Sequence, residues 1–219
     1  SQGRAQTKSA VSYKNPVVDI AMPDPTVIKA ADGYFYVYAT ESTRNVPIMK
    51  SKDLVEWTYC NTAFTNKTRP RFEPKAGIWA PDINYINGKY VLYYAMSVWG
   101  GEQTCGIGVA TADSPQGPFT DHGKMFRSNE IGVQNSIDPS FLQYEGRNYL
   151  VWGSFRGIYV IELTADGLSI MPGAKKKGIA GTAFEAVYIH KHGDYYYMFA
   201  SIGSCCQGVK STYKVVVGR

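Results

Sequence analysis

Hydrophobic and aromatic residues are concentrated along this chain in four short runs, each directly after a turn glycine. The runs cover residues 34–38, 90–94, 149–152 and 195–199, and the glycines are Gly33, Gly88, Gly146 and Gly193. Short apolar runs bounded by turn residues predict β-strands. The glycines are 55, 58 and 47 residues apart, and a repeat near 50 residues is typical of β-propeller blades. The pattern therefore predicts an all-β propeller.

Each repeat predicts a four-stranded antiparallel blade. In the first, a strand after Pro25 turns at residues 31–33 and returns to Thr40. A third strand covers residues 46–50, Asp53 caps the next turn, and Trp57 begins the outer strand. The second and third repeats follow the same order. The fourth ends with a third strand within residues 211–217.

The sequence thus predicts three whole blades and most of a fourth. A propeller that stops inside a blade leaves unpaired strand edges, so we expect a fifth blade to be missing or to lie on a separate peptide. Because Arg219 is a residue after which trypsin-like proteases cut, a C-terminal companion peptide left by cleavage is one form of this hypothesis. Residues 1–14 are predicted to be an N-terminal arm and residues 15–219 the propeller domain.

Composition narrows the function classes. Hydrophobic residues make up 44% of the chain, which suffices for a packed core, and no apolar run approaches the roughly 18 residues of a membrane helix. The net charge is +5, but apart from Lys175, Lys176 and Lys177 the basic residues are scattered. We therefore expect neither a nucleic-acid nor a membrane partner, whereas an anionic matrix such as pectin is compatible with the charge.

Cysteines and histidines do not predict a metal site. The four cysteines are too irregularly spaced for paired zinc ligands, and no histidine has metal-ligand spacing with another. Cys60 and Cys105 are predicted to be separate thiols. Cys205 and Cys206 are neighbours, and a bridge between adjacent residues departs from ordinary disulfide geometry, so two free thiols on a strand are predicted.

Acidic residues recur at matched positions, six to nine residues before each turn glycine: Asp24, Asp82, Asp138 and Glu185. If each blade begins with its innermost strand, these side chains converge on the propeller axis. Convergent carboxylates suggest a glycosidase, which needs one carboxylic acid to protonate the leaving oxygen and one carboxylate opposite it.

The individual acids suit different roles. Asp24 fits a base and Glu185 an acid with a longer reach, while Asp138 would raise the pKa of Glu185 by like-charge repulsion. Taken singly, each could instead be a turn or strand-start residue. This structural interpretation is strongest for Asp82. Trp79 and Trp99 lie beside the predicted axial strands and could serve either as sugar platforms or as core residues.

With these motifs in place, the chain resembles the endo-arabinanases of glycoside hydrolase family 43. The resemblance spans roughly residues 15–219 and rests on segments 23–25, 78–83, 106–111, 117–123, 135–140, 153–155, 184–186 and 205–208, with 211–213 and 218–219 behind them. The Cys-Cys-x-Gly stretch is the most particular to arabinanases. Methionine-proline precedes Asp24 where many arabinanases carry a histidine.

The resemblance implies a five-bladed propeller that hydrolyses α-1,5-linked arabinan internally and with inversion. Asp24 would be the general base, Asp138 the pKa modulator and Glu185 the general acid. Substrate contacts are expected from Trp79, Trp99, Asn135, Ser154 and Phe155. No cofactor is required by the sequence. Relatives often carry a calcium ion on the axis, but no direct metal ligand can be named within these 219 residues.

The expected partner is a polysaccharide, arabinan or the side chains of pectin. Because such a polymer cannot enter the cytoplasm, the protein is expected to be secreted or periplasmic, with any signal peptide already removed. Two alternatives stay open: an exo-acting α-L-arabinofuranosidase or β-xylosidase on the same scaffold, and a non-catalytic carbohydrate-binding propeller. The acids do not separate endo from exo action, which depends on loops.

Overall fold

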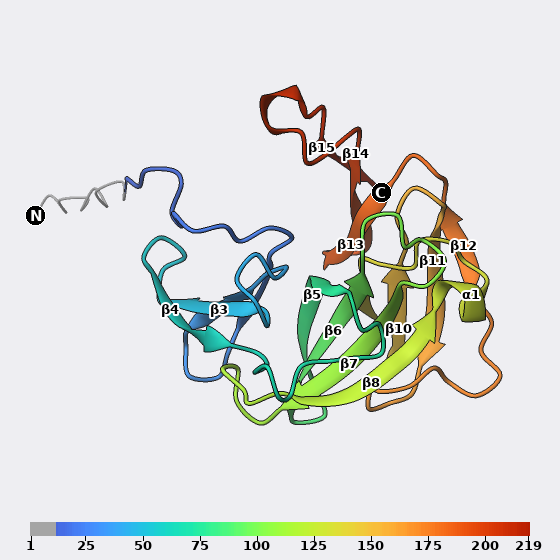
Figure 1. The fold of residues 1–219 in the computed structure, drawn as a ribbon, viewed down its shortest axis with the longest axis horizontal. Coiled ribbons are helices and arrows are strands. Elements are labelled where there is room, and N and C mark those ends of the chain that lie inside the picture. The colour runs from blue at the N-terminus through green and yellow to red at the C-terminus, as the bar shows by residue number, and fades with distance from the viewer. Residues whose placement is uncertain (1–11) are drawn as a thin grey trace, which may run out of the picture.

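Four antiparallel sheets succeed one another along the chain, and within each the strands are hydrogen-bonded in sequence order. The structure is a computed structural model that describes residues 12–219, so residues 1–11 of the predicted arm lie outside the described residues. Blades 1 to 3 have four strands and the fourth sheet has three, and together they form a β-propeller (Figure 1). The predicted all-β propeller with four blades is confirmed.

The strands of the first two blades lie close to the predicted ranges. Asn87 and Gly88 make the turn in blade 2 that the sequence predicts, and Trp57 begins the outer strand of blade 1. Blade 1 contains β1 (Thr26–Lys29), β2 (Phe35–Tyr38), β3 (Pro47–Ser51) and β4 (Trp57–Thr62). Blade 2 contains β5 (Gly77–Ile86), β6 (Lys89–Ser97), β7 (Gly106–Ala112) and β8 (Thr120–Arg127).

The second half of the chain repeats this plan with one strand fewer. Blade 3 contains β9 (Ser140–Tyr144), β10 (Arg147–Trp152), β11 (Ile158–Leu163) and β12 (Lys177–Ala180). The fourth sheet contains β13 (Glu185–His192), β14 (Tyr195–Ile202) and β15 (Lys214–Gly218), without an outer strand among the described residues. Lys177, expected in a loop, begins β12. Two short helices, α1 (Ser128–Ile131) and the 3₁₀-helix η1 (Gly208–Lys210), were not predicted.

The hydrophobic core lies between neighbouring blades. One buried cluster joins blades 1 and 2, a second joins blades 2 and 3, and a third joins blade 3 to the fourth sheet. Buried tyrosines add hydrogen bonds across the same junctions: Tyr38 donates to the Pro115 carbonyl, and Tyr93 donates to the Gly167 carbonyl at 2.8 Å. An aromatic ring thus fills the junction while its hydroxyl pairs with the next blade.

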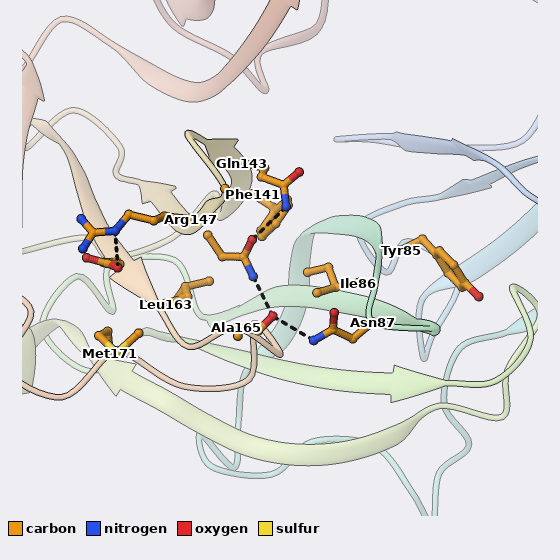
Figure 2. Close-up of a pocket in the computed structure, with 12 residues that line it drawn as sticks. Tyr85, Ile86, Asn87, Phe141, Gln143, Arg147, Leu163, Ala165 and Met171 are labelled. Carbon is orange, nitrogen blue, oxygen red and sulfur yellow. Dashed lines mark hydrogen bonds and ion pairs between the residues drawn. The ribbon is translucent and has the colours of Figure 1, made fainter.

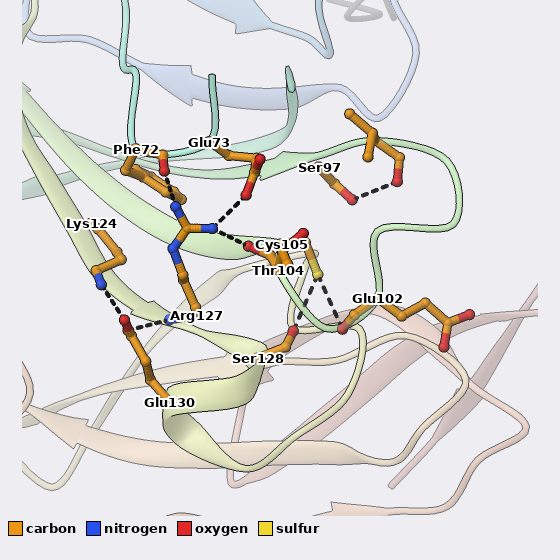
Figure 3. A network of polar contacts seen from close by, with 11 residues as sticks. Phe72, Glu73, Ser97, Glu102, Thr104, Cys105, Lys124, Arg127, Ser128 and Glu130 are labelled. Atoms are coloured by element: carbon orange, nitrogen blue, oxygen red, sulfur yellow. Dashed lines mark hydrogen bonds and ion pairs between the residues drawn. The ribbon is translucent and has the colours of Figure 1, made fainter. Parts of the chain in front are cut away.

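A polar network fastens the loop before β5 to blade 2 (Figure 3). The Arg127 guanidinium forms an ion pair with Glu73, donates to the Phe72 carbonyl, and donates to the Thr104 carbonyl at 2.7 Å. Arginine suits this position because its five donors lie in one plane. The network connects the loop before β5 with the loop before β7 and the end of β8.

The cysteine predictions are half confirmed. Cys60 and Cys105 are free thiols, as predicted, but Cys205 and Cys206 form a disulfide. The prediction of two free thiols on a strand is wrong because these residues lie in the loop between β14 and β15, where Cys206 has a left-handed backbone with φ 67°. Among residues 12–219, neither α1 nor η1 has the length or apolarity needed to cross a membrane.

Candidate active site

Left-handed backbone marks the start of the inner strands where the acids lie. Asp24 has φ 49°, Asp138 has φ 58°, and Ala186, next to Glu185, has φ 51°. A non-glycine residue in this region costs about 1–3 kcal/mol, and such residues gather at functional sites. The pairing of β13 with β14 also shifts register after Glu185. The backbone there departs from the regular alternation of a strand, which re-aims the acidic side chains.

Two of the other recurrent acids, Asp24 and Glu185, lie close enough to Asp138 to influence its carboxylate. Part of Asp138 is accessible, yet protein atoms surround its carboxylate, and burial raises the pKa of Asp138 well above its ordinary value. The negative charges of Glu185 and Asp24 raise it further. The backbone N–H of Ala186 donates to Asp138 Oδ2 at 3.2 Å and opposes the shift. Blades 1 and 3 and the fourth sheet thus each contribute one carboxylate to a common cluster.

Two hydroxyl groups hold Glu185. Ser154 Oγ donates to Oε2 at 2.6 Å, and the Tyr213 hydroxyl donates to Oε1 at 2.7 Å. Asn135 Nδ2 donates in turn to Ser154 Oγ at 3.0 Å. Burial is the largest cause that raises the pKa of Tyr213, and its bond to Glu185 and the Glu185 charge add to it, so the phenol stays a donor.

Asp24 is held by a threonine of its own blade, which also contacts blade 2. Thr40 Oγ1 donates to Asp24 Oδ2 at 2.5 Å, and the backbone N–H of Ala80 donates to the same Oγ1 at 2.7 Å. A hydroxyl can donate and accept at once, so Thr40 couples the acid of blade 1 to the inner strand of blade 2.

Asp82 occupies a different environment. Its residue is 7% exposed, and its Oδ2 accepts from the Phe141 backbone N–H and from Asn84 Nδ2, both at 2.7 Å. Burial raises the pKa of Asp82 to about 6, and these bonds oppose the rise. Because its bonds link the inner strands of blades 2 and 3, the structure favours the structural interpretation of Asp82.

The predicted substrate contacts fall into two groups. The Trp79 and Trp99 rings lie 5.5 Å apart, and Trp99 is 79% exposed, so an indole surface is open to solvent. Ser154, by contrast, is only 2% exposed and uses its hydroxyl on Glu185. Phe155 is partly buried, and its N–H donates to the Phe184 carbonyl at 2.9 Å. That these residues bind substrate stays a prediction.

Sequence reasoning missed two residues that touch the acids. Tyr213 lies in one of the segments that carry the family resemblance, yet nothing in the pattern pointed its hydroxyl at Glu185. Thr40 follows an aromatic strand and gave no signal of its own. Both contacts join residues distant in sequence, by 28 and 16 positions, and periodicity does not reveal such contacts.

Among residues 12–219, no three His, Cys, Asp or Glu side chains are grouped as a metal ion would need. The axial calcium ion stays a prediction, and no catalytic step is derived through it. A cavity that does not contain the acids lies between blades 2 and 3 (Figure 2).

Comparison with known proteins identifies the family. The family model of Glycosyl hydrolases family 43 matches residues 13–219. The extracellular endo-α-(1→5)-L-arabinanase 1 of Bacillus subtilis (strain 168) is 37% identical over 210 residues, which are 90% of this chain and 64% of that protein. The chain thus spans less than two thirds of that relative's length.

Solved structures agree with this result. The α-L-arabinanase of Cellvibrio cellulosa complexed with arabinohexaose superposes with a TM-score of 0.81 at 30% identity, covering 91% of this chain and 70% of that one. An exo-1,5-α-L-arabinanase from a bovine ruminal metagenomic library superposes with a TM-score of 0.77 at 32% identity, covering 90% of this chain and 70% of that one. Fold, arrangement of acids and sequence lead to one conclusion: the chain belongs to glycosyl hydrolases family 43.

Proposed function

We propose that this protein hydrolyses α-1,5-linked arabinan within the chain and with inversion at the anomeric carbon. The observation that carries the proposal is the cluster of Asp24, Asp138 and Glu185, brought together from three sheets, with the pKa of Asp138 raised by burial and by the charges of the other two. Clusters of this kind are typical of catalytic sites. The arabinanases among the family relatives support the choice of substrate.

The proposed step uses two carboxyl groups on opposite sides of the sugar. The Asp24 carboxylate takes a proton from a water molecule, whose oxygen attacks the anomeric carbon. Glu185 gives its proton to the departing glycosidic oxygen as that bond breaks. Inversion requires roughly 6.5–9.5 Å between the two carboxyl groups, which leaves room for the water. Asp138 modulates protonation within the cluster.

Exo action is the second candidate. It is favoured by relatives of similar identity whose names say exo-1,5-α-L-arabinanase and exo-α-(1→5)-L-arabinofuranosidase. The same three acids serve both modes, so the difference depends on whether loops close one end of the substrate groove.

The polymeric substrate also supports a location outside the cytoplasm, in keeping with the word extracellular in the names of relatives.

We further propose that the whole propeller has five blades, the fifth lying beside the fourth sheet. Tyr188, Val215 and Val217 of that sheet are 52%, 66% and 59% exposed, and another blade would cover such apolar side chains. Relatives are longer than this chain.

The experiment is hydrolysis of linear α-1,5-arabinan, with products separated by size and Glu185→Gln tested in parallel. A ladder of oligosaccharides that disappears in the variant, with a loss of about 10²–10⁴-fold in kcat, supports internal cleavage with Glu185 as the acid. Arabinose as the sole early product supports exo action. A Glu185→Gln variant that retains full activity excludes the proposed role, and binding without hydrolysis supports the non-catalytic propeller.

A further inference from the structure

A cavity of about 520 Å³ lies between blades 2 and 3, away from the acid cluster (Figure 2). Residues at the C-terminal ends of β5, β9 and β11 line it, with the turns that follow them. Asp24 and Asp138 precede their inner strands, and Glu185 is the first residue of β13. The cavity is therefore at the opposite strand ends. Its volume lies within the roughly 300–1,000 Å³ of small-molecule sites.

Two carboxamides donate to one backbone carbonyl at this cavity, and a third donates to one of them. Asn148, 6% exposed, donates to the Ala165 carbonyl at 2.9 Å, and Asn87 Nδ2 donates to the same oxygen at 3.1 Å. Gln143 Nε2 donates to Asn148 Oδ1 at 3.4 Å. In the described part of the chain, no hydrogen bond uses Asn87 Oδ1 or Gln143 Oε1. Two amide acceptors are therefore available on an anchored frame.

Charged groups complete the lining. Arg147 Nε pairs with Glu162 Oε1 at 3.3 Å, which leaves the other guanidinium donors and Glu162 Oε2 for a ligand. Tyr85 borders the cavity, but its ring packs against Tyr90, at 5.0 Å between ring centroids, on the face of β5 toward blade 1. Donors and acceptors thus alternate around the cavity.

We propose that this cavity is a second carbohydrate-binding site, which takes a neutral oligosaccharide separately from the acid cluster. Each sugar hydroxyl both donates and accepts, which matches carboxamides and an arginine–glutamate pair. An anionic ligand fits less well, because Glu162 already balances the one arginine. The choice of arabinan as the oligosaccharide rests on the proposed function.

The test measures binding on the Glu185→Gln background, so that the probe survives. Mobility in native gels containing linear α-1,5-arabinan is compared for that protein and for versions carrying Arg147→Ala or Gln143→Ala. The matched control is Lys52→Ala, because Lys52 is an exposed basic residue after β3, outside the cavity. We expect the dissociation constant to rise at least about fivefold for the two cavity variants and to stay unchanged for the control.

A second measurement separates the two sites. Calorimetric titration with arabinotriose should give two bound molecules per chain on the Glu185→Gln background and one when Arg147→Ala is added. Unchanged gel retardation in both cavity variants overturns the proposal, as does retardation by polygalacturonate but not by arabinan. If Glu185→Gln still hydrolyses arabinan, the proposed role of Glu185 fails. The second site is still supported in that case if the cavity variants are retarded less than the parent protein in gels that contain a polymer resistant to cleavage.

Discussion

Blade 2 and the fourth sheet have similar aromatic middle strands but opposite burial. In β6 every residue after Lys89 is buried, whereas in β14 only Ala200 and Ser201 are. Tyr94 of β6 is 0% exposed, and Phe199 of β14 is 37% exposed. Blade 2 has a packed junction on each side, with blades 1 and 3, while the fourth sheet has one described junction, with blade 3.

The difference shows that a strand's composition sets what it can bury, and its neighbours set what it does bury. The tyrosine hydroxyls also differ between the two regions. Tyr93 of blade 2 uses its hydroxyl to join blade 3, whereas Tyr213, before β15, uses its hydroxyl to hold Glu185. In the enclosed blade this hydroxyl joins two blades, whereas in the open sheet it binds a proposed catalytic acid.

The largest expected effect comes from shortening one apolar side chain in each region to alanine. Leu92 of β6 is 0% exposed within the junction of blades 1 and 2, so Leu92→Ala should lower the free energy of unfolding by about 2–5 kcal/mol. Val217 of β15 is 59% exposed, so Val217→Ala should change it by less than about 0.5 kcal/mol. Urea unfolding measures both. Equal losses would show that the outer face of the fourth sheet is covered in solution.

Asp82 of blade 2 should make the stability of the fold depend on pH. Because burial raises the pKa of Asp82 to about 6 in the folded protein, its contribution to stability is fully present below about pH 4 and is lost as pH rises through about 6. The loss approaches about 3 kcal/mol, since one pKa unit corresponds to about 1.4 kcal/mol.

Asp82→Asn does not ionise and should not show this loss. The difference in unfolding free energy between wild type and variant should therefore fall by up to about 3 kcal/mol between pH 4 and pH 7. Urea titrations at several pH values measure it, and taking the difference removes the effects of other carboxyl groups. A difference independent of pH would contradict the buried, titrating Asp82.

The smallest expected effects come from two tyrosine hydroxyls. Tyr93→Phe leaves the Gly167 carbonyl without its donor and should lower the free energy of unfolding by about 1 kcal/mol. Tyr213→Phe removes one donor from Glu185 and should lower kcat on arabinan by about threefold to tenfold, with little change in KM. Unfolding curves and steady-state kinetics on both variants measure the contrast. A loss of stability without a change in kcat in Tyr213→Phe would show that this hydroxyl stabilises the fold and does not serve catalysis.

Much of the fold could be predicted because its signals are local. Asn87-Gly88 and Gly33 mark turns through their backbone preferences, and the apolar run after each predicts a strand with the right limits to within a few residues. The recurrence of Asp24, Asp82, Asp138 and Glu185 at matched positions predicted that acids from different blades would converge. Recurrence alone did not separate Asp82 from the other three, because that depends on the Phe141 N–H supplied by blade 3.

Other features had no local signal. The Cys205–Cys206 disulfide depends on a loop in which Cys206 adopts a left-handed backbone, and adjacency in sequence argued against it. The cavity at Tyr85 and Gln143 needs two blades side by side.

The sequence by itself determined the strand order, the blade repeat and the positions of the acids, because turn chemistry and hydrophobic periodicity act over a few residues. It also determined the family, through the resemblance of its motifs to known sequences. Only the tertiary structure decided which strands are buried, which hydroxyls hold Asp24 and Glu185, and that Asp82 links blades instead of joining the acid cluster. These outcomes depend on distances between residues far apart in the chain, which packing between blades sets.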